Sequence, residues 1–190
     1  MRVEPTAIPD VKLIHLEPHA DPRGLFIELF EAKRYAEHGI PTDWVLDAAS
    51  RQDKAGTVRA LHFQTPPFAQ AKLVRVARGQ ALDVALDIRA GSPWYGRHVA
   101  LELAEDDWRM LYIPVGFAHG FCALVDGTEM AYKLGAPYAP QHGGGVLWND
   151  PDLGIAWPVD EARAILAPRD RTYPLLRDLA PVFTYLGGPR

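Results

Sequence analysis

The sequence predicts an all-β protein, built as an antiparallel barrel or a double-sheet jelly roll. Roughly eight or more short segments alternate apolar and polar residues, with turn residues between them. Helical periodicity is scattered, and the sequence has no glycine-rich phosphate loop, so a βαβ nucleotide-binding fold is excluded. Because the chain has 190 residues, 48% of them hydrophobic, we expect one domain, residues 1–190, with N- and C-terminal extensions.

Charge and hydropathy exclude several classes of partner. The net charge of −4 and the pI of about 6.0 argue against a nucleic-acid surface, and no apolar stretch is long enough to cross a membrane. The N-terminal residues have no apolar signal core, so the sequence predicts a cytoplasmic protein. The single cysteine, Cys122, excludes an intrachain disulfide and is expected to be a buried, unreactive thiol.

The strands and the first helix follow from alternation and from turn residues. The one clear helix of the first half is predicted at 32–39, where Gly39 suits its end and Pro41 follows. A tight hairpin is predicted at Arg78-Gly79. Strands are predicted at 11–16, 25–30, 44–50, 72–79, 80–89 and 127–134, with two more between 98 and 114.

The remaining segments are irregular. A flexible loop is predicted at 136–145, and short helical pieces are predicted at 160–179, with Asp170 in the loop between them. In the strand at 80–89, Asp83 and Asp87 share a face with Ala85, which points either into a polar cavity or into solvent; solvent is the favoured interpretation. In the strand at 25–30, one face mixes aromatic residues with Glu28, as either a polar rim or a wall beside a ligand base.

The stretch from residue 57 to 72 carries the first chemical signal. It places Arg59, His62 and Lys72 among apolar residues, interrupted by Pro66-Pro67. We expect His62 on a strand and Lys72 at the start of the next strand of a hairpin, both facing one cavity. A base and a cation together suit proton removal beside a carbonyl, because the cation stabilises the enolate. The alternative is a hydrogen-bonded core histidine and a surface lysine.

A metal site is poorly supported by the motifs. Small jelly rolls of the cupin type often use a His-x-His pair and a later histidine, but His62 is followed by Phe63 and Gln64. The pattern Pro114-x-Gly116-x-x-His119 matches only the second half of such a motif. Two histidines without a third nitrogen or a placed carboxylate make a poor divalent site, so we expect no metal and no cofactor.

Several blocks resemble one family. The blocks DPRGLFIELF, TVRALHFQTPPFAQAKLVRVARGQALDVALDIRAGSP, LYIPVGFAHGF, AYKLGAPYAP and WNDPDLGIAWP occur in this order over about residues 21–173. They are similar to those of the dTDP-4-dehydrorhamnose 3,5-epimerase family. The resemblance implies a cupin jelly roll with a few short peripheral helices, usually a homodimer that needs no metal. It also implies inversion at C3 and C5 of a nucleotide-linked 4-keto-6-deoxyhexose in deoxysugar biosynthesis.

The resemblance implies roles for individual residues. His62 is the general base, Asp170 fixes its tautomer, Lys72 faces the developing O4 anion and Tyr132 returns a proton on the opposite face. The other matched positions contact substrate: the diphosphate and substrate residues Arg23 and Arg59, the nucleotide contacts across the dimer Phe26 and Glu28, the thymine-stacking Tyr138, and two further contacts, His119 and Arg169.

The chain also departs from the family pattern. Leu46-Asp47-Ala48 stands where the family commonly has Gln-Asp-Asn, and Gly143 stands where it often has a glutamate. Four alternative explanations of these departures stay open: altered recognition of the sugar or nucleotide, inversion at C3 alone, local misalignment, or water that replaces the lost side-chain contacts. Rival readings are a metal-dependent cupin isomerase or dioxygenase and a non-catalytic cupin that binds sugar nucleotides.

Overall fold

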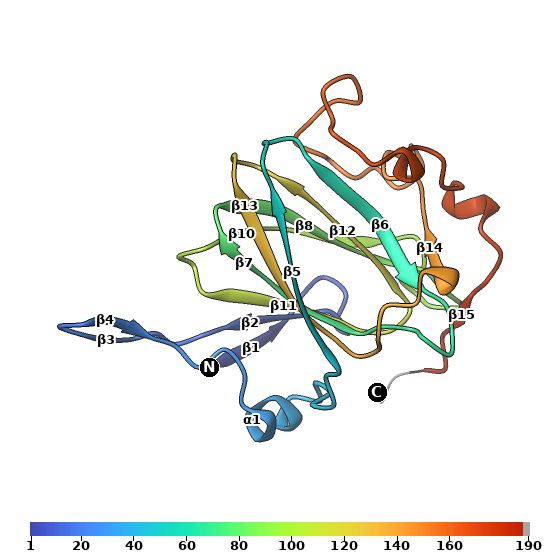
Figure 1. The fold of residues 1–190 in the computed structure, drawn as a ribbon. Coiled ribbons are helices and arrows are strands. Elements are labelled where there is room, and N and C mark those ends of the chain that lie inside the picture. Colours follow the sequence, from blue (N-terminus) through green and yellow to red (C-terminus); the bar gives the residue numbers. More distant parts are fainter. Residues whose placement is uncertain (188–190) are drawn as a thin grey trace.

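The computed structural model describes residues 1–187 and shows a sandwich of two antiparallel sheets (Figure 1). The six-stranded sheet has the order β1-β2-β11-β7-β13-β5 and the five-stranded sheet the order β10-β8-β12-β6-β14. The six-stranded sheet consists of β1 (Arg2–Pro5), β2 (Lys12–His15), β5 (Leu46–Gln52), β7 (Lys72–Arg78), β11 (Arg109–Ile113) and β13 (Thr128–Leu134). The five-stranded sheet consists of β6 (Val58–Gln64), β8 (Gln80–Asp87), β10 (His98–Ala104), β12 (Phe117–Ala123) and β14 (Gly143–Gly145).

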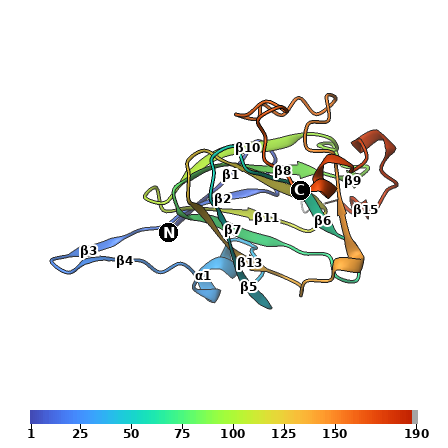
Figure 2. The same ribbon diagram turned by 45° about the horizontal axis from the view of Figure 1, so that its top comes forward.

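Smaller elements surround the sandwich. A hairpin projects away from it in both views (Figures 1 and 2), and a short parallel pair joins the C-terminal segment to the five-stranded side. Within residues 1–187 no helix is long and apolar enough to span a membrane. The projecting hairpin consists of β3 (His19–Asp21) and β4 (Gly24–Phe26), and the parallel pair of β9 (Arg89–Ala90) and β15 (Phe183–Thr184). The helices are α1 (Ala32–Glu37) and the 3-10 helices η1 (Pro140–His142), η2 (Pro168–Arg171) and η3 (Leu176–Asp178). The predicted jelly roll is confirmed.

Three apolar clusters hold these layers together. The first lies between the sheets and includes Val74, Leu111 and Phe121. The second packs the outer face of the five-stranded sheet against the C-terminal segment, and the third packs the outer face of the six-stranded sheet against α1 through Tyr35. Cys122 belongs to the second cluster, and burial raises its pKa to about 11, which agrees with the predicted unreactive thiol.

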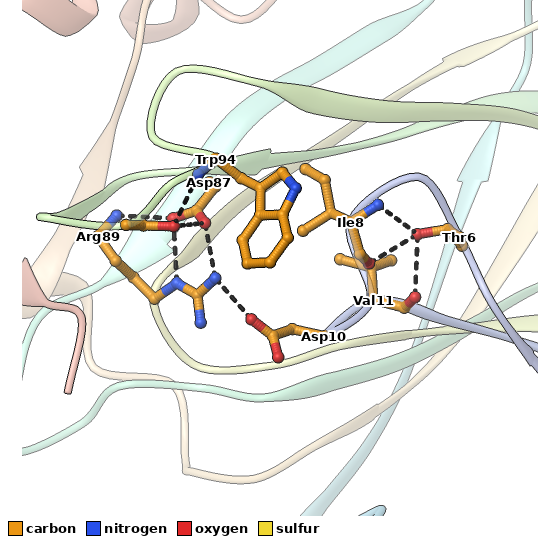
Figure 3. A network of polar contacts seen from close by, with 8 residues as sticks. Thr6, Ile8, Asp10, Val11, Asp87, Arg89 and Trp94 are labelled. Atoms are coloured by element: carbon orange, nitrogen blue, oxygen red, sulfur yellow. Dashed lines mark hydrogen bonds and ion pairs between the residues drawn. The ribbon is translucent and has the colours of Figure 1, made fainter. Parts of the chain in front are cut away.

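An ion-pair network fixes the N-terminal segment to the five-stranded side (Figure 3). The carboxylate of Asp87 is fully buried and accepts from the guanidinium of Arg89 at 2.6 Å and from the hydroxyl of Ser92 at 2.7 Å. Arg89 also donates to Asp10 at 2.8 Å. The prediction that Asp87 faces solvent is therefore wrong; the carboxylate is buried because a rigid forked cation neutralises it.

Two predicted hairpins are wrong. β7 and β8 do not pair at Arg78-Gly79, because β7 joins the six-stranded sheet and β8 the five-stranded sheet. β6 and β7, which carry His62 and Lys72, likewise lie in different sheets. Alternation identifies a strand but does not choose its partner, and here the chain crosses between sheets at both turns.

Local predictions need smaller corrections. The strand predicted at 25–30 ends at Phe26, because β3 offers a partner of only three residues. The helix begins after Glu31, which accepts from the backbone N–H of Lys33 and Arg34 at 3.0 and 2.9 Å, and ends before Gly39. The predicted loop at 136–145 contains η1 and β14, which pairs with β6. Asp170 lies inside η2 rather than between helical pieces.

Candidate active site

A bulge in β6 directs two predicted site residues into the space between the sheets. His119 of β12 pairs with His62, and Phe121 pairs with Arg59. Between these two pairs β12 advances by two residues and β6 by three, so β6 contains one extra residue. Without that extra residue, strand alternation would send Arg59 and His62 to opposite faces. Gly120 permits the bulge, because a Cβ there would lie 2.4 Å from the Cβ of Ala60.

Two adjoining hollows, each of about 290 Å³, meet at these residues. Both are lined by His62, Gln70, Lys72 and Tyr138. We call their combined space the cavity. One hollow adds Arg59, His119, Tyr132, Ala48, Ala49, Ser50, Phe121 and Leu134. The other adds Phe63, Gln64, Pro140, Gly143, Gly144, Arg169 and Tyr173.

His62 is held by a buried carboxylate. Its Nε2 lies 2.9 Å from Oδ1 of Asp170, whose side chain is 2% exposed. Because a carboxylate only accepts, Nε2 carries the hydrogen and Nδ1 keeps its lone pair. A neutral imidazole oriented in this way can act as a general base.

Lys72 supplies a buried cation next to this base. Its Nζ donates to the backbone carbonyl of His62 at 3.3 Å, and the residue is 9% exposed. Burial lowers the pKa of Lys72 to about 8, against the opposing effect of the Asp83 carboxylate. Lys72 is therefore largely protonated at neutral pH and can stabilise an oxyanion in a partly dehydrated space.

Tyr132 lies on the other sheet. Its hydroxyl lies 2.9 Å from Oγ of Ser50, and burial raises its pKa to about 12. The phenol therefore stays protonated at neutral pH. Since β6 and β13 belong to facing sheets, the base and this acid approach the cavity from opposite walls.

Asp83 is a site residue that sequence reasoning assigned to solvent. It is fully buried, and its carboxylate accepts from Nε2 of His119 at 3.0 and 3.2 Å. Burial lowers the pKa of His119, although Asp83 acts in the opposite direction. The sequence offered only a weak signal for this burial, the small Ala85 on the same face, which is itself fully buried.

The remaining cavity residues are more open. Tyr138 is 65% exposed, and its hydroxyl beside Arg169 raises the pKa of that guanidinium. Gln64 was not predicted as a site residue; its side chain fixes the Tyr138 loop by donating to the Phe68 and Pro137 carbonyls and accepting from the Ala139 N–H.

Three predicted contacts lie outside the cavity in this single chain. Arg23 is 89% exposed and pairs with Asp21, and Phe26 is 67% exposed on β4. Glu28 accepts from Arg34 at 2.9 Å. All three belong to the projecting hairpin or the segment that follows it (Figure 2).

Two of the departures from the family pattern, Ala48 and Gly143, lie at the cavity wall. Ala48 pairs with Tyr132 across β5 and β13 and presents only a methyl group to the cavity. Leu46 pairs with Leu134 at the end of the same strands. Gly143 opens β14, opposite Gln64. Within residues 1–187, no three His, Cys, Asp or Glu side chains are grouped so that they could hold a metal ion.

Comparison with known proteins identifies the family. A model described as dTDP-4-dehydrorhamnose 3,5-epimerase matches residues 5–178. The curated dTDP-4-dehydrorhamnose 3,5-epimerase of Sinorhizobium fredii is 42% identical over 98% of this chain and 95% of its own. A dTDP-4-dehydrorhamnose 3-epimerase of Streptomyces niveus is 38% identical over 94% of this chain and 85% of its own.

A solved structure agrees with these sequence matches. The dTDP-6-deoxy-D-glucose-3,5-epimerase of Legionella pneumophila, crystallised in complex with dTDP-4-keto-L-rhamnose, superposes with a TM-score of 0.92. It is 38% identical, and the match covers 98% of this chain and 99% of the other. Sequence and fold agree over nearly the whole length, and the chain therefore belongs to the dTDP-4-dehydrorhamnose 3,5-epimerase family.

Proposed function

We propose that this protein is an isomerase that inverts C3 and C5 of a dTDP-linked 4-keto-6-deoxyhexose in deoxysugar biosynthesis. The observation that carries the proposal is the cavity that His62 and Tyr132 line from facing sheets, together with the buried cation Lys72. Inversion requires a base and an acid on opposite sides of the ring, because a proton leaves one face and another arrives on the opposite face.

The proton transfers use the ketone at C4. Nδ1 of His62 takes the proton from C3, the C–H electrons form a C3–C4 double bond, and the carbonyl electrons move to O4. Lys72 stabilises the resulting enolate. The carbonyl then re-forms as the C3–C4 electrons take the phenolic proton of Tyr132 on the other face. Exchange with solvent restores both groups, and the same sequence at C5 completes the reaction.

The other residues that line the cavity have proposed roles in binding the substrate. Arg59 offers a forked cation for the diphosphate, and Tyr138 offers an exposed ring for stacking on the base. His119, held by Asp83, and Arg169, beside Tyr138, contact the sugar nucleotide.

The proposed active form is a homodimer. Arg23, Phe26 and Glu28 would complete a substrate site from across the interface. Their place on a projecting hairpin and its following segment supports this arrangement, because the hairpin extends away from the sandwich of its own chain (Figure 1) and exposes Leu25 and Phe26. Light scattering should give twice the monomer mass.

Inversion at C3 alone is the second candidate. A 3-epimerase of Streptomyces niveus is among the relatives, at 38% identity, and the methyl group of Ala48 opposite Tyr132 is the structural observation that supports this candidate. Because Ala48 lies beside the proposed acid Tyr132, a smaller side chain at position 48 changes how the sugar lies in the cavity, and therefore which carbon receives the proton of Tyr132.

Deuterium uptake tests both candidates. The protein is incubated with dTDP-4-keto-6-deoxyglucose in heavy water, with and without EDTA, and C3 and C5 are followed by NMR. Exchange and inversion at both carbons, unaffected by EDTA, are expected. Exchange at C3 alone would establish the second candidate. Tight binding with no exchange at either carbon would overturn the catalytic proposal for this substrate and favour a binding role.

A further inference from the structure

Tyr173 packs against a glycine of β14. A Cβ at Gly145 would lie 2.5 to 2.7 Å from three carbons of the Tyr173 ring, so the ring lies directly against the Gly145 backbone. The backbone beside this contact is fixed, because the Leu147 N–H donates to the carbonyl of Pro174 at 2.8 Å. Only glycine at position 145 leaves room for the ring.

The same ring reaches the proposed base. Gly145 pairs with His62 across β14 and β6. The rings of Tyr173 and His62 have centroids 5.8 Å apart and meet edge-on at 67°. Tyr173 also lines the cavity beside His62. The position of Gly145 opposite His62 is therefore what brings an aromatic ring to the imidazole.

A hydrogen bond from Nε2 to Asp170 fixes one atom of the imidazole, but it does not fix the plane of the ring. The χ2 torsion of histidine is broad, so the ring can rock while the bond survives. An edge-on aromatic neighbour restricts that rocking, because the two quadrupoles favour one relative orientation. The lone pair on Nδ1 must point at the C–H bond that it breaks, so the plane of the ring matters for proton transfer.

We propose that Tyr173 is a positioning residue that sets the plane of the His62 ring, and that Gly145 exists to admit it. This inference rests on the proposed function, since it concerns the residue that takes the proton. The ring, and not the phenolic hydroxyl, performs this role, because the contact with His62 and the contact with Gly145 are both made by ring atoms.

Four variants test the inference, assayed by solvent deuterium exchange. Tyr173→Ala removes the ring, and Tyr173→Phe keeps it without the hydroxyl. Gly145→Ala leaves Tyr173 in the sequence but displaces its ring. Gly135→Ala is the matched control, because a Cβ there makes only ordinary contacts, the nearest at 3.5 Å from the Ala71 nitrogen.

We expect kcat to fall about 10- to 100-fold in Tyr173→Ala and in Gly145→Ala, with a much smaller change in KM. Tyr173→Phe and Gly135→Ala should stay within about twofold of the unmodified protein. Nitrogen-15 NMR of the imidazole, without substrate, should show a broadened or shifted His62 signal in Tyr173→Ala and Gly145→Ala only. Circular dichroism and thermal unfolding establish that each variant folds.

The outcomes separate the two proposals. If the unmodified protein exchanges neither carbon, the proposed function fails, whatever the variants do. If it exchanges and folded Tyr173→Ala keeps both its kcat and its His62 signal, the positioning role is refuted. The same holds if Tyr173→Phe loses as much kcat as Tyr173→Ala, because the hydroxyl would then carry the effect. A rise in KM with unchanged kcat would make Tyr173 a substrate contact instead.

Discussion

Nε2 of His62 lies 2.9 Å from Oδ1 of Asp170, although 108 positions separate the two residues in the sequence. β6 supplies the histidine, and η2, in the C-terminal segment that covers the outer face of the five-stranded sheet, supplies the acid. The proposed base therefore depends on the docking of the C-terminal segment as well as on the sandwich.

This pair predicts a graded loss of activity. His62→Asn should lower kcat by about 10²- to 10⁴-fold, because it removes the base. Asp170→Asn should give a smaller loss, since its side-chain oxygen still accepts from Nε2 but no longer stabilises the imidazolium. His98→Asn, a histidine on β10 outside the cavity, is the control. Equal activity in all three variants, measured by deuterium exchange, would exclude His62 as the base.

Lys72 predicts an alkaline limit to activity. Because its pKa is lowered to about 8, kcat should fall as the pH rises through about 8 and the ammonium loses its charge. Asp83, His62 and His119 are the titratable groups around it, and Tyr132, whose pKa is raised to about 12, remains protonated throughout this window. A rate profile that stays flat to pH 10 would contradict this role for Lys72.

The same group has the opposite effect on stability. In the unfolded chain Lys72 titrates near its ordinary value of 10.5, so between about pH 8 and 10.5 the unfolded state holds more protons. The contribution of Lys72 to the free energy of unfolding therefore rises with pH in that window, and it is constant below about pH 8, where both states hold the proton. Lys72→Met should abolish this rise in urea unfolding measured at several pH values, while also lowering kcat.

Tyr132→Phe should separate proton removal from inversion. Without the phenolic proton, His62 can still remove a proton and return one from the same face, so deuterium should enter C3 with the configuration retained. Ser50→Ala, which removes only the hydrogen-bond partner of Tyr132, should still invert. NMR coupling constants around the ring distinguish retention from inversion, and continued inversion in Tyr132→Phe would assign the acid to another residue.

Asp83 is expected to control the charge on Lys72. Asp83→Asn removes the buried carboxylate that raises the pKa of Lys72, so the alkaline limit of kcat should move to lower pH. Asp160→Asn, which changes an exposed carboxylate paired with Arg163, should leave the profile in place. An unmoved limit in folded Asp83→Asn would show that another charge holds Lys72 protonated.

Arg89 is expected to matter for stability and not for chemistry. Arg89→Met leaves the buried carboxylate of Asp87 without its forked cation, and should lower the free energy of unfolding by about 3–5 kcal/mol. Arg163→Ala, at an exposed pair, should change little. Urea unfolding measures both, and kcat per folded molecule should be unchanged. An unchanged unfolding midpoint in Arg89→Met would mean that the hydrogen bond from Ser92, together with solvent, is enough to stabilise the Asp87 carboxylate.

Most of the fold could be predicted from local sequence. The strands at 11–16, 72–79, 80–89 and 127–134 were located nearly to the residue, because alternation marks a sheet with faces in different surroundings. Strand partners were not predictable in this way: both proposed hairpins failed, since alternation carries no information about which sheet a strand joins.

The candidate site likewise has features that the local sequence determines and features that only tertiary contacts determine. By itself, the sequence determined the family, the jelly roll and the residue types for carbon-acid chemistry, because ordered motif blocks and alternation are local properties. The tertiary structure alone decided that Arg59 and His62 share a face, that Asp83 is buried against His119, and that Tyr173 meets His62 over Gly145. These relationships arise from a bulge and from close approach between segments that are distant in the sequence, and both depend on which backbones come into contact.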